Sequence, residues 1–564
     1  MGQVVCLVGE AGIGKSRLAY ECQQAFGAAR WRMVQALSYG QATPYHAVIP
    51  LLRTVLGVAE TAPPAQQRQA IHTHLAAIDP TLAADTPLLA LLLGVPVTTE
   101  ELPVLDPEVQ RRRLQHACCQ ALLQQATDAP LCLLVEDGHW LDPSSQELLD
   151  LLVAALARRP ILLLCTARPG FRHAWTDSTY FHQMAVAPLG ASETAALVRD
   201  LVRPYAVAPA LVAWIQARTG GNPLFVEELV RTMQAQGLFV LQGNLYEVDE
   251  ARRYTLPASV QGIVQTRLDR LPAAEKSLLQ IAAVIGPAVS VPVLQALVHG
   301  TPEELHRRLR ALQAAELLYE MGTMPSPTYT FKHALVQDAA YQSLLPRTRQ
   351  QYHQQIAQVL EQQFPDTVAT QPELLAQHYT AAGLPTHAIP YWQEAGQQAR
   401  QRSANQEAVQ HLTTGLALLA TLPETPARAQ QDLDLRLALG AALIATRGYA
   451  APEVEQTYTR ARALCAQIGD TPQLFPTLQG LCQFYYGRGA FPAARELGEQ
   501  LYQLAQCEAT PTHLLEAHDA LGSTLFYLGE YAAARTHLEQ GIARSDPTVE
   551  GALALHHGVS PGVR

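Results

Sequence analysis

The first 190 residues alternate short apolar runs with longer segments in which apolar residues recur at helical spacing. Five runs read as strands: "QVVCLVG", "WRMVQALS", "LCLLVED", "ILLLCTAR" and "HQMAVAPL". Continuous Val, Leu and Ile strands separated by helices are typical of a parallel sheet buried on both faces. A long helical segment, residues 44–128, is inserted between the second and third runs. The pattern predicts an α/β domain over residues 1–190.

The remaining chain follows an almost entirely helical pattern. Residues 191–242 read as purely helical, and residues 256–345 read as short helices that end in a hairpin, "ELLYEMG…TYTFKH". Helices followed by a small hairpin suggest a winged helix. Everything beyond residue 385 is predicted to be helical. The fold class is therefore α/β followed by all-α.

A repeat is visible in the last helical region. "GAFPAARELG" begins at Gly489 and "GEYAAARTHL" begins 40 residues later at Gly529; both fit Gly-x-aromatic-x-x-Ala. A weaker copy begins at Ser403, and a degraded one fits near "GYAAPEVEQTY". The pattern predicts a tetratricopeptide-like solenoid over residues 386–564 with repeats longer than about 34 residues, the alternative being an Ala-rich helical bundle. Because the chain stops at "HHGVSPGVR" without a polar capping helix, we expect an array cut short.

Composition excludes some partners. Forty basic against fifty acidic residues give a net charge of −10, which argues against a strong non-specific hold on nucleic acid or anionic membrane. The nine cysteines lie mostly in apolar runs without a C-x-x-C pair, as in a reducing compartment. The start lacks the features of a signal peptide, and the longest apolar runs are shorter than the roughly 20 residues of a membrane helix. We expect a cytoplasmic protein with protein partners.

The stretch "GEAGIGKSRL" follows the first strand and has P-loop spacing. Its glycines let the backbone curl with N–H groups pointing inward, and the following helix adds the positive end of its dipole. Lys15 would reach the β and γ phosphates of ATP, and Ser16 would bind the accompanying Mg²⁺. The predicted nucleotide-binding residues of this segment are Gly9, Gly12, Gly14, Lys15, Ser16 and Arg17.

The third strand ends in two carboxylates, Glu136 and Asp137. Carboxylates at the carboxyl edge of a parallel sheet beside a P-loop hold Mg²⁺ and the attacking water. We expect one acid, Glu136, to contact the metal through water and the other to polarise the nucleophile. Asp142 precedes Pro143 and is either a further site residue or only a helix cap. His139 and Trp140 fit a packed corner equally well.

Six motifs in a fixed order carry a resemblance: "GQVVCLVGEAGIGKSRL", "LLVEDGHWLDPSSQELLDLL", "CTARPG", "RTGGNPLFVEELV", "LPASVQGIVQTRLDRLP" and "FKHALVQDAAYQSLLP". They resemble the ATPase half of bacterial cyclase-linked and LuxR-type STAND regulators, which are signal-transduction P-loop ATPases with tetratricopeptide repeats. The resemblance implies five segments: an AAA-like core (1–190), a helical lid (191–253), a winged helix (254–345), a linker (346–385) and repeats (386–564).

The resemblance also implies roles for three further residues. Arg168 would sense the γ-phosphate, Pro223 would pack on adenine, and His333 would contact the β-phosphate of ADP. Their structural alternatives are a surface arginine, a helix-starting proline and a packed histidine. Glu136 stands where many relatives have Asp, which puts the rate of hydrolysis in question, and Gly138 and Leu141 also depart from the family pattern.

The function expected from these features is a switch that is open with ATP, closed with ADP and hydrolyses ATP slowly. The repeats would bind a partner protein, and a cyclase or DNA-binding output domain would lie in a longer or neighbouring chain. A nucleotide-dependent oligomer is left open. One alternative is a DNA-binding regulator whose winged helix uses Arg307, Arg308 and Arg310. The other is a repeat scaffold with an inactive ATPase.

Overall fold

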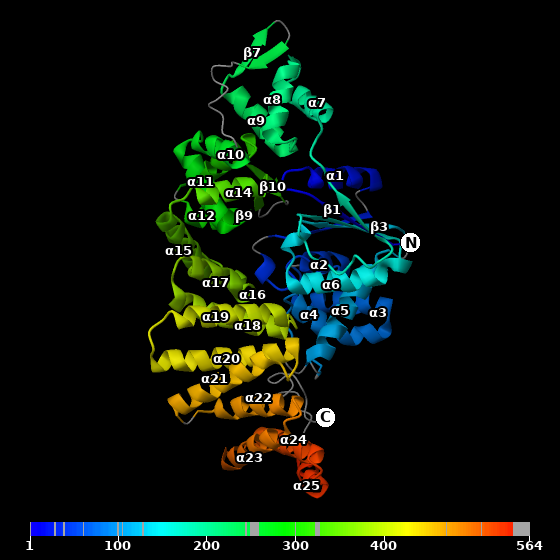
Figure 1. Ribbon diagram of the computed structural model, residues 1–564, viewed down its shortest axis with the longest axis vertical. Helices are drawn as coiled ribbons and strands as arrows, with labels where there is room; N and C mark the ends of the chain where they lie inside the picture. Colours follow the sequence, from blue (N-terminus) through cyan, green and yellow to red (C-terminus); the bar gives the residue numbers. More distant parts are fainter. Residues whose placement is uncertain are drawn as a thin grey trace.

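The computed structural model describes residues 2–544 except 28–29, 38–39, 60, 99–100, 104, 106, 127–128, 243–244, 249–258, 299, 322–327, 470 and 509. The chain is elongated: a small helical lid lies at one end of the long axis and the last helices of the C-terminal array lie at the other (Figure 1). The α/β domain lies between them.

Five parallel strands of the described chain form the central sheet, in the order β2-β3-β4-β1-β5. They are β1 (Gln3–Val8), β2 (Trp31–Gln35), β3 (Leu131–Glu136), β4 (Ile161–Ala167) and β5 (Phe181–Ala185). All five predicted strand runs are therefore strands. Because parallel strands point the same way, the ends of β1, β3 and β4 lie along one edge of the sheet.

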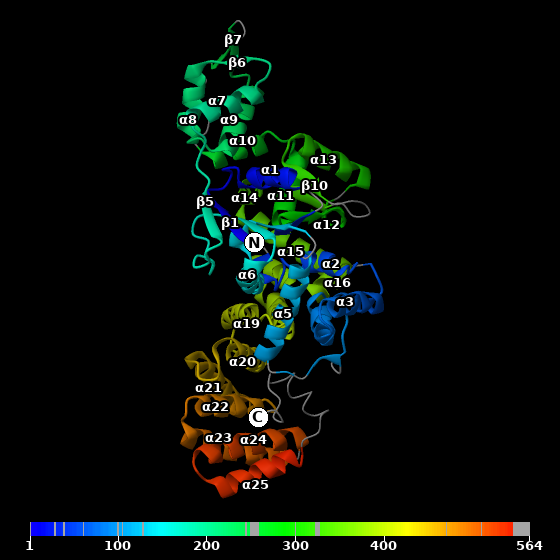
Figure 2. The ribbon, with the colours of Figure 1, turned by 90° about the vertical axis from the view of Figure 1, so that its right-hand side faces the viewer.

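Helices cover both faces of the centre of the sheet. Helix α1 (Lys15–Phe26) lies on one side, and α2 (Ile49–Leu56), α5 (Pro107–Gln124) and α6 (Pro143–Ala155) lie on the other (Figures 1 and 2). Alternate residues of β3 pack on opposite faces: Leu134 joins the α1 side, whereas Leu133 joins the larger core. Most β5 residues are exposed, so burial on both faces holds for the central strands and fails at this edge.

The segment predicted as a helical insertion is helical. Its elements are η2 (Gly40–Ala42), α2, α3 (Pro64–Ile78), η3 (Pro80–Asp85), α4 (Thr86–Leu92) and α5. They pack around a fully buried set of leucines and continue the core under the sheet. The short helices η5 (Gly138–Trp140) and η6 (Leu156–Arg158) flank α6.

The lid contains a small sheet in addition to its helices. Helices α7 (Ala191–Leu201), α8 (Pro209–Thr219) and α9 (Pro223–Ala235) are joined by β6 (Ala206–Val207), β7 (Phe239–Gln242) and β8 (Leu245–Val248). The expectation that residues 191–242 are purely helical is therefore wrong. β7 and β8 pair antiparallel, with Phe239 opposite Val248.

Residues 259–342, here called the hairpin unit, contain the predicted hairpin. Its helices are α10 (Val260–Asp269), α11 (Ala273–Ile285), α12 (Val291–Leu297), α13 (Pro302–Ala314) and α14 (Ala334–Gln342). Its strands are β9 (Ala288–Ser290), β10 (Leu318–Met321) and β11 (Thr328–Phe331). β11 pairs antiparallel with both β10 and β9. A separate apolar core holds this unit together.

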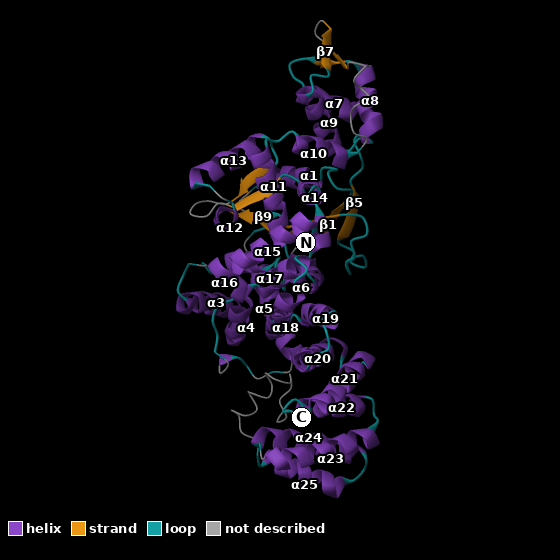
Figure 3. Ribbon diagram, turned by 90° about the vertical axis from the view of Figure 1, so that its left-hand side faces the viewer, coloured by secondary structure: helices purple, strands orange, loops and turns teal. Residues whose placement is uncertain are grey.

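From Pro346 the described chain is a succession of helices, purple throughout the lower half of Figure 3. They are α15 (Pro346–Gln363), α16 (Pro365–Thr370), α17 (Pro372–Ala381), α18 (Pro385–Gln401), α19 (Asn405–Ala420), α20 (Pro426–Arg447), α21 (Pro452–Ile468), α22 (Leu474–Gly487), α23 (Phe491–Glu508), α24 (Pro511–Tyr527) and α25 (Tyr531–Ile542). The predicted absence of a final capping helix concerns residues outside the described part. No described helix has both the length and the apolar character needed to span a bilayer.

The repeat motif marks the tight turns between paired helices. Ser403, Gly448, Gly489 and Gly529 all have positive φ, between 58° and 82°, and each precedes the second helix of a pair. This left-handed conformation favours glycine and ends the first helix. The motif alanines Ala408, Ala494 and Ala534 are buried where the helices meet. The recurring Gly-x-aromatic-x-x-Ala sequence thus has a direct geometric cause.

Close packing of the array depends on glycines inside its helices. The ring of Tyr458 on α21 lies between Gly440 of α20 and Gly480 of α22. A Cβ atom built on Gly440 or Gly480 would lie 2.5 Å or 2.3 Å from the Cζ atom of Tyr458. Neither position has room for a methyl group, so these two glycines fix the spacing of three successive helices.

We predict that Gly480→Ala lowers the free energy of unfolding by about 1–3 kcal/mol, because the methyl group overlaps a buried ring. Urea unfolding followed by circular dichroism measures the change. Gly541→Ala is the matched control, because its Cβ would lie 3.6 Å from the nearest atom and alanine favours a helix. Equal destabilisation by the two substitutions would contradict this account.

Candidate functional site

The P-loop connects β1 to α1, as the spacing predicts. Gly12 and Gly14 have φ of 77° and 103°, a region that side chains rarely adopt. A Cβ on Gly9 would lie 2.9 Å from the Cγ2 atom of Ile13, so this position also requires glycine. These constraints explain why the turn is glycine-rich.

Lys15 lies inside this turn. Its Nζ atom donates hydrogen bonds to the carbonyl oxygens of Gly9 at 2.8 Å and Glu10 at 2.9 Å, and only 7% of the residue is exposed. Burial lowers the pKa of Lys15, the carboxylate of Asp137 opposes this effect, and the Arg168 guanidinium adds to it. The ammonium is therefore held in the turn, facing the end of β3.

The two acids at the end of β3 face different neighbours. Burial raises the pKa of Glu136, and a hydrogen bond from the Ser16 hydroxyl opposes the rise. Burial also raises the pKa of Asp137, while the charges of Lys15 and Arg168 lower it. Asp137 has a φ of 54°, and its N–H donates to Oγ1 of Thr166 at 2.9 Å. The strand end thus directs one acid to Ser16 and the other to the two cations.

Arg168 follows β4 and lies within the same group. Its guanidinium carbon is 5.8 Å from the centre of the Trp140 ring, a cation–π contact. Its charge lowers the pKa of His139, whose pKa is about 4 chiefly because of burial. His139 and Trp140 therefore form a packed corner that supports the arginine.

The lid contacts the P-loop directly through the sequence "GGNPLF". Asn222 donates from Nδ2 to the carbonyl oxygen of Ala11 at 2.9 Å, and the Leu224 N–H donates to that of Gly12 at 3.2 Å. A Cβ on Gly12 would lie 2.7 Å from the Cβ of Leu224. Pro223 is the first residue of α9, and these two bonds place it beside the nucleotide loop.

His333 approaches the site from the hairpin unit. It caps α14: its Nδ1 accepts a hydrogen bond from the Leu335 N–H at 3.2 Å. An accepting Nδ1 leaves the proton on Nε2, so the neutral ring is a donor there. Burial lowers the pKa of His333 to about 4, and the nearby charges of Arg168 and Lys15 add to this. The histidine therefore stays neutral at physiological pH and faces the loop.

An ion-pair network ties the lid to the hairpin unit next to His333. Lys332 Nζ lies 2.5 Å from Oε2 of Glu316 and 3.9 Å from Oε2 of Glu227 on α9. Arg231 of α9 also pairs with Glu316, and Glu228 pairs with Arg267 of α10. These ion pairs link α9 to the hairpin unit.

Most predicted site residues meet at the carboxyl edge of the sheet. Those brought together are Gly9, Gly12, Gly14, Lys15, Ser16, Glu136, Asp137, Arg168, Pro223 and His333. Arg17 is not among them: it lies on the exposed side of α1, paired with Glu21 at 2.6 Å. Asp142 caps α6 by accepting the Ser145 N–H at 2.8 Å.

Three contributors were not predicted. Asn222 precedes a proline at a helix start, which marks it as a cap but does not reveal its contact with the loop. Thr166 orients the backbone of Asp137, and Lys332 adjoins His333; neither stands out in the sequence. Their contacts join segments far apart along the chain.

The residues of the loop fit a polyphosphate accompanied by Mg²⁺. In the described structure no side chain caps the N-terminus of α1, so its first N–H groups can donate to an anion. A Cβ on Gly14 would meet no atom within 4 Å, which shows open space above the turn. Ser16 and Glu136 supply oxygen atoms of the kind that Mg²⁺ prefers.

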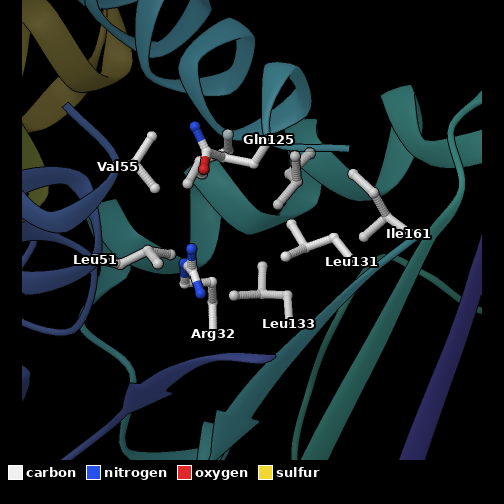
Figure 4. A pocket seen from close by; sticks show the side chains of 9 residues that line it. Arg32, Leu51, Val55, Gln125, Leu131, Leu133 and Ile161 are labelled. Carbon is white, nitrogen blue, oxygen red and sulfur yellow. The ribbon is translucent and has the colours of Figure 1, made fainter. Parts of the chain in front are cut away.

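A small cavity elsewhere in the domain is a different feature. Figure 4 shows Leu131 and Ile161, the first residues of β3 and β4, in its wall, with the polar ends of Arg32 and Gln125 nearby. It therefore lies at the amino edge of the sheet, opposite the P-loop.

Comparisons with known families agree with this geometry. Residues 1–164 match the AAA ATPase domain family. That range includes the P-loop and the acidic strand end, so the N-terminal domain is a P-loop ATPase domain of the AAA type. Residues 190–241, which contain the helices of the lid, match a domain of unknown function.

One curated relative matches nearly the whole chain. An uncharacterized protein of Rhizobium meliloti (strain 1021) is 27% identical over 559 residues, which cover 97% of this chain and 53% of that protein. The chain thus spans about half the length of this relative.

Two solved structures are similar in part. A Signal Transduction ATPase with Numerous Domains (STAND) protein with a tetratricopeptide repeat sensor, from Pyrococcus horikoshii, has a TM-score of 0.40 and 13% identity, covering 96% of this chain and 80% of its own. BtubC from P. vanneervenii has a TM-score of 0.28 and 12% identity, covering 35% of this chain and 80% of its own.

We predict that Lys15→Ala removes ATP binding and leaves the fold intact, because the lost ammonium is the charge inside the loop. Calorimetric titration with ATP and Mg²⁺, run beside a melting curve, tests this. Arg17→Ala is the matched control: its guanidinium points to solvent, and we expect affinity within about twofold of wild type for such an exposed pair. Unchanged affinity in Lys15→Ala would place the nucleotide elsewhere.

Proposed function

We propose that this protein is a nucleotide-controlled signalling switch of the STAND class that hydrolyses ATP slowly. The observation that carries the proposal is the meeting, at one edge of the sheet, of the P-loop, the acidic strand end, Arg168 and His333. These groups come from separate segments, and the last belongs to a separate unit with its own core. ATP hydrolysis alone does not require a separate unit, such as the hairpin unit, that contacts the phosphates of the bound nucleotide.

Each residue then has a role in binding or resetting the switch. Lys15 binds the β and γ phosphates, Asp137 polarises the attacking water, and Arg168 senses the γ-phosphate. Ser16 and Glu136 would hold Mg²⁺, which would neutralise charge on the phosphates. Pro223 packs on adenine. His333 donates from Nε2 to the β-phosphate of ADP, which its neutral tautomer allows.

The contacts of the lid support assignment of this conformation to the closed state. Asn222 and Leu224 bond the P-loop, and the ion pairs of Lys332 and Arg231 join the lid to the hairpin unit. In the proposed cycle ADP favours this arrangement and ATP favours an open one. Hydrolysis returns the open form to the closed form.

We further propose that the helical repeats bind a partner protein and thereby bias this equilibrium. The output, a cyclase or a DNA-binding domain, would lie outside this chain, which spans 53% of its curated relative. A reducing, cytoplasmic location fits the nine cysteines, all of them free thiols and seven of them buried.

We expect Asp137→Asn to retain ATP binding and lose hydrolysis, because an amide keeps the shape but cannot polarise water. Glu136→Gln should instead weaken the dependence of binding on Mg²⁺. Wild-type turnover should lie well below the roughly 1–100 s⁻¹ typical of kinases. Phosphate release by purified protein measures turnover, and calorimetric titration with ATP at several Mg²⁺ concentrations measures binding and its dependence on Mg²⁺. Wild-type rates in both variants would refute the assignment of the acidic pair.

We expect His333→Ala to speed ADP release by about one to two orders of magnitude, because a hydrogen bond to a charged group contributes roughly 1.5–3 kcal/mol. ATP affinity should change little, since the hairpin unit has moved away in the open form. Stopped-flow release of a fluorescent ADP analogue gives the rate.

Two further variants separate this role from helix capping. His333→Asn keeps the cap of α14 but cannot reach as far, so it should release ADP quickly without loss of melting temperature. His306→Ala changes an exposed histidine of the same unit and should behave as wild type. Equal weakening of ADP and ATP binding would mean that His333 only packs.

A further inference from the structure

The helical repeats contact the ATPase domain through a buried carboxylate. Glu407 lies in the first turn of α19 and is 0% exposed. Its Oε1 accepts the Ser144 N–H at 2.8 Å, and its Oε2 accepts the Ser144 hydroxyl at 2.9 Å. Ser144 belongs to the first turn of α6, the helix that follows the acidic strand end. Figure 2 shows α6 above α19.

Two further contacts flank this one. Thr43 donates from Oγ1 to Oε1 of Glu373 on α17 at 2.6 Å, and Gln406 donates from Nε2 to Oε1 of Glu147 on α6 at 2.7 Å. Each of them joins one donor to one oxygen, whereas Glu407 uses both oxygens. The interface therefore centres on Glu407 and the start of α6.

A second buried carboxylate opposes Glu407. Asp142, the cap of α6, is 1% exposed, and its Oδ1 accepts the N–H groups of Ser145 and Tyr45, each at 2.8 Å. Burial raises the pKa of Glu407 to about 7, and the charge of Asp142 adds to the rise. Burial also raises the pKa of Asp142 to about 6. The charge of Asp142 therefore disfavours ionisation of Glu407, whereas the hydrogen bonds from Ser144 favour it.

The other titratable groups of this interface have partners or stay neutral. Glu147 is paired with Arg111 of α5 at 2.8 Å. Burial raises the pKa of Tyr45 well above its usual range and lowers that of His411, on α19, to about 4. Glu373 is bonded to Thr43, and the charge of Arg402, the residue after α18, acts on it. Asp142 is the charged group that acts on Glu407.

We propose that Glu407 is a proton-controlled latch. In its neutral form Oε1 accepts the Ser144 N–H and the protonated Oε2 donates to the Ser144 hydroxyl, which holds the repeats against α6; its ionised form, repelled by Asp142, releases them. The docked interface binds the proton more tightly than an exposed carboxyl does. Docking is therefore strongest at low pH and weakens as pH rises through about 7, the pKa of docked Glu407. The role of this latch in regulating the nucleotide site rests on the proposed switch function.

The path from the latch to the nucleotide site is short and tightly packed. Between Asp142 and Asp137 lies only the turn η5 with Leu141. A Cβ on Gly138 would lie 2.8 Å from Sγ of Cys165, and the Trp140 ring lies beneath Arg168. Because this segment is closely packed, we expect a shift of the first turn of α6 to displace Asp137 and Arg168 as well.

Hydrogen–deuterium exchange of the full nucleotide-free chain tests the latch at pH 6, 7 and 8, after correction for intrinsic rates. Protection of the first turns of α6 and α19 in wild type should fall about tenfold from pH 6 to pH 8, as expected when a carboxyl of normal pKa is raised to about 7 on docking. Glu407→Gln keeps the shape and an acceptor for Ser144, so its protection should stay high at every pH. Glu407→Ala should be unprotected at every pH.

The matched surface control is Glu394→Gln, which changes an exposed acid on α18 and should follow wild type. The same pH dependence in wild type and Glu407→Gln would overturn the latch. If Glu407→Ala does not fold, the comparison of wild type with Glu407→Gln decides alone.

ADP release by the same proteins tests the coupling to the nucleotide site. At pH 7, Glu407→Ala should release ADP at least about tenfold faster than Glu407→Gln, a change of about 1.4 kcal/mol. Lost docking with unchanged ADP release would overturn the coupling. A wild-type protein that binds no nucleotide would refute the switch itself, and the exchange experiment would still decide whether the latch exists.

Discussion

All chemistry of the candidate site depends on one constraint: parallel strands end at the same edge of their sheet. β4 lies between β1 and β3, and all three strands run the same way. The sheet alone therefore brings together the P-loop, the two acids and Arg168. The pKa values record this proximity, since Asp137 acts on Lys15 and Arg168 acts on His139 and His333. The lid and the hairpin unit then close over groups that the sheet has already assembled.

Sequence reasoning succeeded where local pattern decides structure. The five strands, the glycine-rich turn and the β10–β11 hairpin each follow from residues adjacent in the chain. It failed for β7 and β8, because the apolar run before "GN" fits a helix as well as a strand. Asp142 was correctly identified as one of two alternatives, and its capping bond settles that point.

The site was predictable in its residue types but not in its long-range contacts. Nothing in the local sequence distinguishes Lys332 or Glu407 from other surface charges of helical proteins, because their partners lie far away in the chain. Arg17 illustrates the reverse error: its neighbours Lys15 and Ser16 face the loop, but helical rotation turns the next side chain to solvent. Burial, which sets every pKa shift of the site, is a property of the assembled fold.

The ion pairs between α9 and the hairpin unit have a mechanical consequence. Residues 186–190 connect the sheet to the lid, and α15 follows the hairpin unit and leads into the helical array. The lid and the hairpin unit are therefore connected to the rest of the chain at two different places. Ion pairs join the two units between these connections. Farther along the array, the glycines that contact Tyr458 set the spacing of three helices. In the proposed switch, movement of the array would thus reach the lid through α15 and the hairpin unit.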